Sequence, residues 1–302
     1  MIVRGESRGM WMALALGAAV CFGLRGVLYR KTSQKTRDWQ LLLCGGFLTG
    51  AIVSLALALA ARQRWTADVW IGAVMGVLSF AGNASMYRGL AVGKTSIVAV
   101  LSGLPPVVAA AAAYFFWGER LNAFQATSFV LIMAAVPLLK HGGGWSGSGA
   151  VWGLLTMLFF GLNDAAGKQS ARLGADIFPV MFAMFATGTS LFALAQAFGR
   201  RRGGGRRGGG AGDPDSAGHA SWGPLETFAK GMAVGLTNVV GLTFMLSAMR
   251  TGPTALVSAI AGLNVLLLLL YGRLALRESF TRPELAGMAL ALSGVVLLRL
   301  FG

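Results

Sequence analysis

The sequence predicts an all-α integral membrane protein with ten transmembrane helices, arranged as two inverted five-helix repeats. Three observations lead to this prediction. The 302 residues are 55% hydrophobic and only 12% charged, whereas soluble domains carry about 25% charged residues. Apolar stretches of about 20 residues, the length that crosses a hydrocarbon core, recur from one end of the chain to the other. The second half of the chain also repeats residues of the first half.

Each apolar stretch is expected to be a helix, because lipid offers the backbone no hydrogen-bond partners. The stretches are too long and too uniformly apolar for barrel strands, which have about 10 residues of alternating polarity. The first stretch follows Arg4 and Arg8 and is longer than the apolar core of a signal peptide, so we expect an uncleaved helix. The expected spans are residues 10–29, 40–61, 69–90, 96–117, 123–140, 149–168, 177–198, 227–249, 254–275 and 284–301.

The two halves meet at a Gly- and Ser-rich linker over residues 141–149, a composition typical of flexible connections. We therefore expect a first five-helix repeat over residues 1–141 and a second over residues 142–302. The second contains a Gly- and Arg-rich loop at about 199–224, which cannot bury a core and is expected to be disordered. Its arginines either contact anionic lipid headgroups or belong to a solvated insertion.

The internal repeat has two offsets. The first part of the repeat recurs after 138 residues, and its later part recurs after 159 residues. A single insertion the size of the Gly- and Arg-rich loop explains the difference. Because each repeat has an odd number of spans, the second copy must enter the membrane from the opposite face, which is the inverted-repeat arrangement typical of secondary transporters. The matches include Phe22-Gly23-Leu24 with Phe160-Gly161-Leu162, Asp38 with Asp176, Thr49-Gly50 with Thr187-Gly188, Gly82 with Gly241, Thr95 with Thr254, Gly103-Leu104 with Gly262-Leu263, and Glu119 with Glu278.

Helix-start signals recur in the same way. Asn122 and Gln125 have the spacing of a capping box, and Thr281 and Glu284 have it at the equivalent place in the second half. In a capping box each side chain accepts a hydrogen bond from the other residue's backbone, which satisfies two free amides of the first turn. We therefore expect the fifth and tenth spans to begin in the same way.

Several short motifs accompany this repeat. Phe22-Gly23 stands near the end of the first span, Tyr87-Arg88-Gly89-Leu90 ends the third, and Gly118-Glu119-Arg120-Leu121 precedes the fifth. With their second-half copies, these motifs resemble the EamA-like ten-helix members of the drug/metabolite transporter superfamily. The resemblance covers nearly the whole chain except the Gly- and Arg-rich loop. Phe replaces the Trp that the family often has before this Gly, in both halves.

The resemblance implies export or uptake of a small metabolite or drug-like compound, driven by an ion gradient or by exchange. It also implies a multi-pass protein of the cell (inner) membrane with both termini in the cytoplasm. The basic residues disagree with this orientation, because more of them lie on the opposite side, and positive residues usually mark the cytoplasmic side.

Ionisable side chains within spans are costly in lipid and are therefore candidates for function. Arg25 lies in the later part of the first span, and Asp164 lies in the corresponding part of the sixth, beside Asn163, the repeat counterpart of Arg25. If they share a cavity, Arg25 would bind an anionic substrate group and Asp164 would accept a proton or a cationic amine. In the alternative, Asp164 pairs with Lys168 one turn along its helix, and Arg25 extends to the membrane interface.

A second polar set lies in the third, fourth, eighth and ninth spans. Amides and hydroxyls there can orient a substrate within an apolar cavity, or they can hydrogen-bond neighbouring helices. The candidate substrate-binding residues of this set are Asn83, Tyr87 and Asn264. Helix packing is the expected role of Ser102, Asn238 and Thr243.

Proline and glutamate mark two further features. Pro105-Pro106 removes backbone donors within the fourth span and is expected to kink or locally break it, whereas Asn264 stands at the place of Pro105 in the second half. Glu119 and Glu278 lie at helix junctions. We expect both to be structural, because a carboxylate near the start of the next helix is favourable.

The formal charge of +15 would suggest a nucleic-acid partner in a soluble protein. Here the basic residues lie mostly at helix ends and in loops, where membrane proteins keep them, so no such partner is expected. The two cysteines and two histidines have no metal-ligand spacing, and the spans hold no carboxylate cluster. Neither an enzyme nor a cofactor or metal site is therefore expected.

The expected function is transport of a small molecule by alternating access, with the bilayer, the substrate and a coupling proton or ion as partners. An inverted repeat suits this role because two related halves can exchange conformations, so that one cavity opens to either side. A lipid or lipid-linked-sugar translocator and a non-transporting scaffold or receptor are the alternatives.

Overall fold

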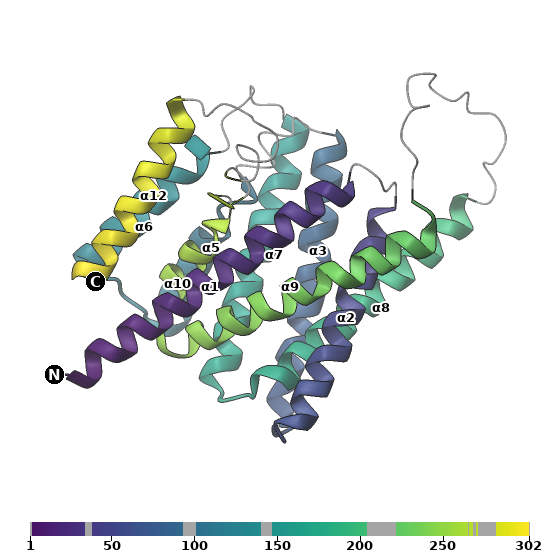
Figure 1. The fold of residues 1–302 in the computed structure, drawn as a ribbon, viewed down its shortest axis with the longest axis horizontal. Helices are drawn as coiled ribbons and strands as arrows, with labels where there is room; N and C mark the ends of the chain where they lie inside the picture. Colours follow the sequence, from purple (N-terminus) through teal and green to yellow (C-terminus); the bar gives the residue numbers. More distant parts are fainter. Residues whose placement is uncertain are drawn as a thin grey trace.

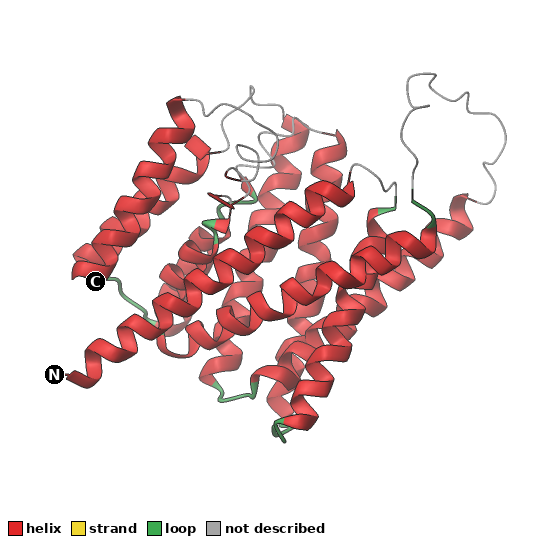
Figure 2. Ribbon diagram, viewed as in Figure 1, coloured by secondary structure: helices red, strands yellow, loops and turns green. Residues whose placement is uncertain are grey.

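The computed structural model describes residues 2–33, 38–92, 101–139, 147–203, 222–264, 266–267, 270 and 282–301, and within these ranges it is helical without a strand (Figure 1). The predicted all-α class is therefore confirmed. Figure 2 shows the described residues as helices and short loops. The helices are α1 (Ile2–Ser33), α2 (Trp39–Ala60), η1 (Ala67–Val69), α3 (Trp70–Val92), α5 (Pro105–Trp117), α6 (Ala123–Leu139), α7 (Gly147–Arg172), α8 (Ile177–Gly203), α9 (Pro224–Thr251), α10 (Thr254–Ala261) and α12 (Arg282–Phe301).

The described helices suit a membrane. Large apolar side chains such as Phe115 and Phe116 are 80% and 75% exposed, as expected where lipid surrounds the protein. Six segments are long and apolar enough to cross a membrane: Gly9–Leu28, Trp39–Ala60, Ala67–Met86, Ala150–Arg172, Ile177–Phe198 and Pro224–Thr251. Shorter apolar helices lie at Pro105–Trp117, Ala123–Leu138 and Leu285–Leu297. The chain is a multi-pass membrane protein, and the number of ten spans stays a prediction.

Two predictions fall partly outside the described residues. The expected spans 96–117 and 254–275 include residues 96–100 and 271–275, which are not described. The Gly- and Arg-rich loop expected at 199–224 includes residues 204–221, which are not described either. At its start, α8 continues to Gly203, so residues 199–203 are helical and the expected loop began too early.

Four short connections gather at one end of the helix bundle, together with the start of α1 and the end of α12 (Figure 1). We call this end the terminal face. The helix α1 begins at the terminal face, whereas its repeat counterpart α7 ends there, so the two helices cross the bundle in opposite directions. The four connections are residues 61–66, 118–122, 173–176 and 252–253.

Helices of one half pack mainly against helices of the other. The helix α1 packs on α9, and its counterpart α7 packs on α3; likewise α2 packs on α9, and α8 packs on α3. Two further pairs join counterparts directly, namely α2 with α8 and α6 with α12. Each of these contacts between the halves thus recurs with the halves exchanged, which is the pattern of a two-fold axis.

Aromatic rings on α2 and α8 show the same exchange in atomic detail. The ring of Phe47 covers Gly188, and the ring of Phe185 covers Gly50; a Cβ at these glycines would lie 2.3 and 2.5 Å from the rings. The two rings meet edge to face with centroids 5.5 Å apart. All four residues are repeat counterparts at the offset of 138, so the pseudo-two-fold axis passes between α2 and α8.

The glycines of α3 and α9 extend this symmetry. A Cβ at Gly82 would lie 2.7 Å from the ring of Phe160, and a Cβ at Gly241 would lie 2.7 Å from the ring of Phe22. Small residues at these crossings let the helices approach closely. The resulting van der Waals packing holds the helices together, because lipid provides no hydrophobic driving force for their association.

The fourth and ninth spans are both interrupted. The chain turns at Ser102-Gly103, and α5 starts at Pro105 with proline in its first turn. In the second half α10 ends at Ala261, and the chain turns at Gly262-Leu263 before helix resumes at Asn264. Because this second break occurs without a proline, Pro105 alone does not explain the pair of breaks. Both halves share a Gly-Leu step at this place.

The predicted capping box at the start of α6 is confirmed. The Asn122 amide donates to Oε1 of Gln125 at 3.1 Å, and the Gln125 amide donates to Oδ1 of Asn122 at 2.8 Å. The equivalent pair includes Thr281, which lies outside the described residues.

Candidate functional site

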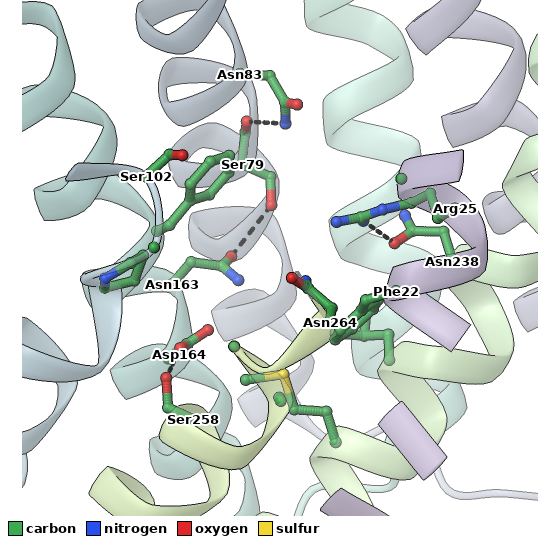
Figure 3. Close-up of a pocket in the computed structure, with 18 of the residues that line it drawn as sticks. Phe22, Arg25, Ser79, Asn83, Ser102, Asn163, Asp164, Asn238, Ser258 and Asn264 are labelled. Carbon is green, nitrogen blue, oxygen red and sulfur yellow. Dashed lines mark hydrogen bonds between the residues drawn. The ribbon is translucent and has the colours of Figure 1, made fainter. Parts of the chain in front are cut away.

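A cavity of about 370 Å³ lies between the two halves, where α1, α3, α5, α7, α9 and α10 meet (Figure 3). This volume is at the lower end of the range of about 300–1,000 Å³ that small-molecule sites occupy. Its apolar wall consists mainly of Phe22, Phe47, Met86, Phe160, Met184, Leu242 and Met245. Its polar side chains are Arg25, Ser79, Asn83, Ser102, Asn163, Asp164, Asn238, Ser258 and Asn264.

The two helix breaks contribute directly to this wall. Ser102, Gly103, Pro105 and Pro106 line it from the first half, and Ala261, Gly262 and Asn264 line it from the second. Non-helical backbone at membrane depth is tolerated where it lines a cavity, because polar groups freed from the helix can be satisfied there. The breaks thus place backbone and amide groups around a space that is otherwise largely apolar.

Arg25 lies in the cavity wall and is partly buried. Its Nη1 donates a hydrogen bond to Oδ1 of Asn238 on α9, and its guanidinium lies 4.9 Å from the centre of the Phe22 ring on its own helix. The contact with the ring is a cation–π interaction, which stabilises a cation in an apolar setting. Arg25 is therefore held inside the bundle and does not extend to the membrane interface as in the alternative.

A symmetry-related pair also joins the two halves. Asn163 on α7 corresponds to Arg25, and Ser79 on α3 corresponds to Asn238. The Ser79 hydroxyl donates to Oδ1 of Asn163 at 3.3 Å. Equivalent positions are thus joined by a hydrogen bond in both pairs, although only one of the four side chains, that of Arg25, carries a charge.

Asp164 occupies the wall beside Asn163. The hydroxyl of Ser258 on α10 donates to its Oδ2, so neighbouring residues of α7 reach two different helices, α3 and α10. In Figure 3, Asp164 and Arg25 stand on opposite sides of the cavity.

With this geometry established, the comparisons with known proteins identify the family. A sequence model of the EamA-like transporter family matches residues 9–139 and again residues 147–300. The chain belongs to the EamA-like transporter family. This family is part of the drug/metabolite transporter superfamily, so the resemblance stated from the sequence motifs is confirmed.

A solved crystal structure supports the fold of this EamA-like protein. It superposes with a TM-score of 0.73 at 17% sequence identity, covering 97% of this chain and 99% of that one. At this identity the likeness concerns the fold alone. No protein of curated function matches the chain. The family is one of membrane transporters and not of enzymes.

Most residues proposed from the sequence meet at the cavity of this transporter. Arg25, Asn83, Asn163, Asp164 and Asn264 line it. The side chain of Asn83 donates to the Ser79 carbonyl at 2.7 Å on its own helix. Pro105 and Pro106 line it as well. Tyr87 belongs to α3, but its side chain lies outside what the structure describes.

The sequence interpretation missed four polar side chains. Ser79 and Ser258 were not singled out, and Ser102 and Asn238 were expected to serve helix packing, yet all four line the cavity. Ser79 and Asn238 could have been found by carrying the repeat offset through to the polar positions of α3 and α9. Ser258 has no such signal, because it looks like any serine of an apolar helix.

The alternative pairing of Asp164 with Lys168 is wrong. Lys168 is buried, and its Nζ lies 3.1 Å from Oε1 of Glu119 and donates to the carbonyls of Met249 at 2.9 Å and Gly252 at 3.0 Å. A helix turns by about 100° per residue, so side chains four residues apart point about 40° away from each other. Asp164 and Lys168 therefore reach different neighbours.

Glu119 is structural, as expected, but it stabilises another helix than the one expected. Its two carboxylate oxygens accept hydrogen bonds from the amide of Thr254 at 3.0 Å and from the Thr254 hydroxyl at 3.3 Å. Thr254 is the first residue of α10. The carboxylate therefore caps a helix of the second half, while the helix that follows Glu119 is capped by its own Asn122.

Proposed function

We propose that this EamA-like protein is a secondary carrier of small metabolites or drug-like compounds in the cell (inner) membrane. In this proposal ten spans form two inverted repeats, residues 1–141 and 142–302, and the cavity is the substrate site. The carrier works by alternating access, in which the two halves exchange conformations and expose the cavity to one side at a time.

The observation that carries this proposal is the composition of the cavity wall. It is built from repeat counterparts of both halves, so the cavity lies on the pseudo-two-fold axis that relates them. A site on the axis keeps its walls when the halves exchange conformations, which alternating access requires. The pairs are Phe22 and Phe160, Arg25 and Asn163, Gly26 and Asp164, Ser79 and Asn238, Asn83 and Leu242, Met86 and Met245, Ser102 and Ala261, Gly103 and Gly262, and Pro105 and Asn264.

Contacts at the terminal face suit one end state of such a cycle. The Arg64 amide donates to Oδ2 of Asp176 at 2.7 Å, and the Phe178 amide donates to Oε1 of Gln63 at 2.9 Å. With the ion pair of Lys168 and Glu119 at 3.1 Å, these contacts join the two halves. In the proposed cycle they break when the cavity opens toward the terminal face.

Within this proposal the charged residues have distinct roles. Arg25, held by Asn238, binds an anionic group of the substrate. Asp164 binds a cationic group or the coupling proton. The uncharged amides of Asn83, Asn163 and Asn264 orient the substrate through hydrogen bonds.

The test is transport by the purified protein in liposomes. A metabolite panel is first screened for compounds that raise the melting temperature, because a ligand that binds only the folded state stabilises it. Uptake of the radiolabelled hits is then measured for the native protein and for Gly26→Trp. Gly26 lines the cavity, and a Cβ there would meet nothing within 4 Å, so the indole fills the cavity without disturbing the helices.

Gly9→Trp is the matched control, since Gly9 lies on the same helix outside the cavity and has the same open surroundings. We expect transport by the native protein and by Gly9→Trp, and none by Gly26→Trp. Equal transport by Gly26→Trp would place the pathway elsewhere. Movement of fluorescent lipids instead of the hits would favour a lipid translocator, and the absence of both would favour a scaffold.

A further inference from the structure

We propose that a second pocket, between the ends of α5 and α7, binds an anionic phospholipid, with the lipid phosphate at Arg172 and the start of an acyl chain beside it. This inference goes beyond the carrier function and does not depend on it. We call this space the interfacial pocket. It is lined by Phe116, Trp117, Ala165, Ala166, Gln169, Arg172 and Leu173.

The interfacial pocket lies where α5 and α7 end at the terminal face (Figure 1). Its volume is about 630 Å³, which is within the range of small-molecule sites. The two helices pack on each other, and the small side chains of Ala165 and Ala166 leave space between them. Arg172 is the last residue of the apolar segment Ala150–Arg172, so the mouth of the pocket lies at the level of the lipid headgroups.

Contacts across the two helices fix the polar end of this pocket. The indole Nε1 of Trp117 on α5 donates to Oε1 of Gln169 on α7 at 2.9 Å. The Arg172 guanidinium, about one turn further along α7, lies 6.0 Å from the centre of the Trp117 ring, a distance at the limit of a cation–π contact. The hydrogen bond therefore fixes the indole against α7, and the indole keeps the cation beside the pocket.

The charge of Arg172 is available to an anion. Its side chain is exposed, and the carboxylates closest to the pocket in the chain have other partners. Glu119 pairs with Lys168 at 3.1 Å, and Asp176 accepts from the Arg64 amide at 2.7 Å. Within the described residues the structure thus gives Arg172 no carboxylate partner. The planar guanidinium presents its N–H donors in a fork that matches two oxygens of a phosphate.

The helix ends at the pocket do not present a full set of free carbonyls. A helix C-terminus carries partial negative charge, which would oppose an anion. At the end of α5, Gly118 has a φ of 63°, and the amide after it donates back to the Ala113 carbonyl at 3.1 Å. At the end of α7, Gly174 has a φ of 71°, and the amide after it donates back to the Ser170 carbonyl at 3.1 Å. These return bonds satisfy carbonyls of the last turn and so weaken the opposition to an anion.

The rest of the pocket is apolar and faces lipid. Phe116 is 75% exposed and Leu173 is 46% exposed, while Ala165 and Ala166 line the deeper part. At 1.5 Å per residue, the pocket extends about 10 Å along α7 from Arg172 to Ala165. A soluble anion would leave these walls uncovered, whereas a phospholipid covers them with its glycerol and first methylene groups. Basic pockets between transmembrane helices at headgroup level recognise anionic lipids in this way.

The experiment uses the full-length protein in detergent and two lipids with the same acyl chains, anionic phosphatidylglycerol and zwitterionic phosphatidylcholine. Native mass spectrometry counts the lipids that stay bound during a titration. Thermal unfolding measures the stabilisation that each lipid gives, because a ligand of the folded state raises the melting temperature. We expect one phosphatidylglycerol to bind at a roughly fivefold lower concentration than phosphatidylcholine, as expected for one cation at headgroup level. In Arg172→Gln this preference should be lost.

Three variants separate the charge from the apolar wall. Arg172→Lys keeps the charge without the fork, so it should retain part of the preference and show that the loss in Arg172→Gln is not caused by misfolding. Ala166→Leu fills the apolar part and should weaken the binding of both lipids. Arg88→Gln is the matched control and should keep the preference, because Arg88 is also exposed and lies 5.4 Å from the centre of the Trp152 ring, but does not line this pocket.

Three results would overturn the proposal. The native protein could bind both lipids equally well, Arg172→Gln could keep the full preference, or Arg88→Gln could lose as much of it as Arg172→Gln does, which would indicate a general attraction of lipids to basic residues. Glycerol phosphate, the soluble headgroup, should give no stabilisation; if it stabilises the protein as well as phosphatidylglycerol does, the pocket binds a free anion and the proposal is wrong. None of these outcomes bears on the carrier proposal, which is tested at the cavity between the halves.

Discussion

Substitution of Lys168 by Met is expected to destabilise the protein strongly. The Lys168 ammonium makes three contacts, with Oε1 of Glu119 at 3.1 Å and with the carbonyls of Met249 at 2.9 Å and Gly252 at 3.0 Å. The side chains of Lys168 and Glu119 are 11% and 21% exposed. The variant therefore leaves a largely buried carboxylate and two carbonyls at the end of α9 without their cation.

The magnitude follows from this geometry. Removing one partner of a buried ion pair costs about 3–5 kcal/mol. Because Glu119 is partly exposed and keeps its two hydrogen bonds to Thr254, we expect a loss of about 2–4 kcal/mol in the free energy of unfolding. At roughly 2–4 °C per kcal/mol for a chain of this size, the melting temperature should fall by about 5–15 °C.

The assay is thermal unfolding in detergent, followed by tryptophan fluorescence. Lys230→Met is the matched control, because Lys230 is exposed and its Nζ lies 5.7 Å from the centre of the Trp222 ring. It should change the melting temperature by a few degrees at most. A drop in Lys168→Met no larger than that of the control would refute the view that this contact holds the two halves together.

Exchanging the two charges tests whether the helix ends contribute to the stability of this ion pair. Glu119 lies at the N-terminus of α10, and Lys168 lies at the C-terminus of α9, so each charge also matches the sign of its helix end. The double variant Lys168→Glu with Glu119→Lys keeps an ion pair but reverses both matches. It should therefore remain destabilised, and full recovery of stability would show that the helix ends do not matter.

Three further predictions concern packing, capping and the cavity. Gly231→Ala should lower the melting temperature by several degrees, at about 1–3 kcal/mol, because its Cβ would lie 2.1 Å from a backbone carbonyl oxygen of α2; Gly9→Ala, with nothing within 4 Å, should be neutral. Asn122→Ala should cost about 1 kcal/mol, measured in the same way, and an unchanged melting temperature would contradict the capping role of the 2.8 Å bond to the Gln125 amide. Asn238→Leu should weaken stabilisation by anionic ligands about tenfold, because it removes the acceptor that holds Arg25 in the cavity wall; unchanged ligand affinity would show that Arg25 does not take part in binding.

The local elements of this fold could be read from the sequence because their causes are local. A stretch such as residues 40–61 is apolar throughout and becomes α2 over Trp39–Ala60. Asn122 and Gln125 lie three residues apart, and their reciprocal capping bonds form within one turn. Neither feature depends on the rest of the chain.

Other features needed the arrangement of the whole bundle. The break at Pro105 has a local cause, but the break at Gly262-Leu263 has no proline and was not foreseen. Its position beside the cavity explains why the freed backbone groups are tolerated there. Likewise, the spacing of Asp164 and Lys168 suggested a pair on one helix, but their partners Ser258 and Glu119 come from elsewhere in the chain.

The sequence by itself determined that this protein is helical, crosses the membrane several times and contains two related halves, because apolar length, capping signals and repeated residues are carried by the chain in order. It also identified Arg25 and Asp164 as unusual, since a charge in an apolar span is costly wherever it lies. Only the tertiary structure decided that Arg25 meets Asn238, that Asp164 meets Ser258 and that both border one cavity. The reason is physical: these contacts join residues 213 and 94 positions apart, and the crossing of packed helices, not the spacing along any one of them, sets which side chains face each other.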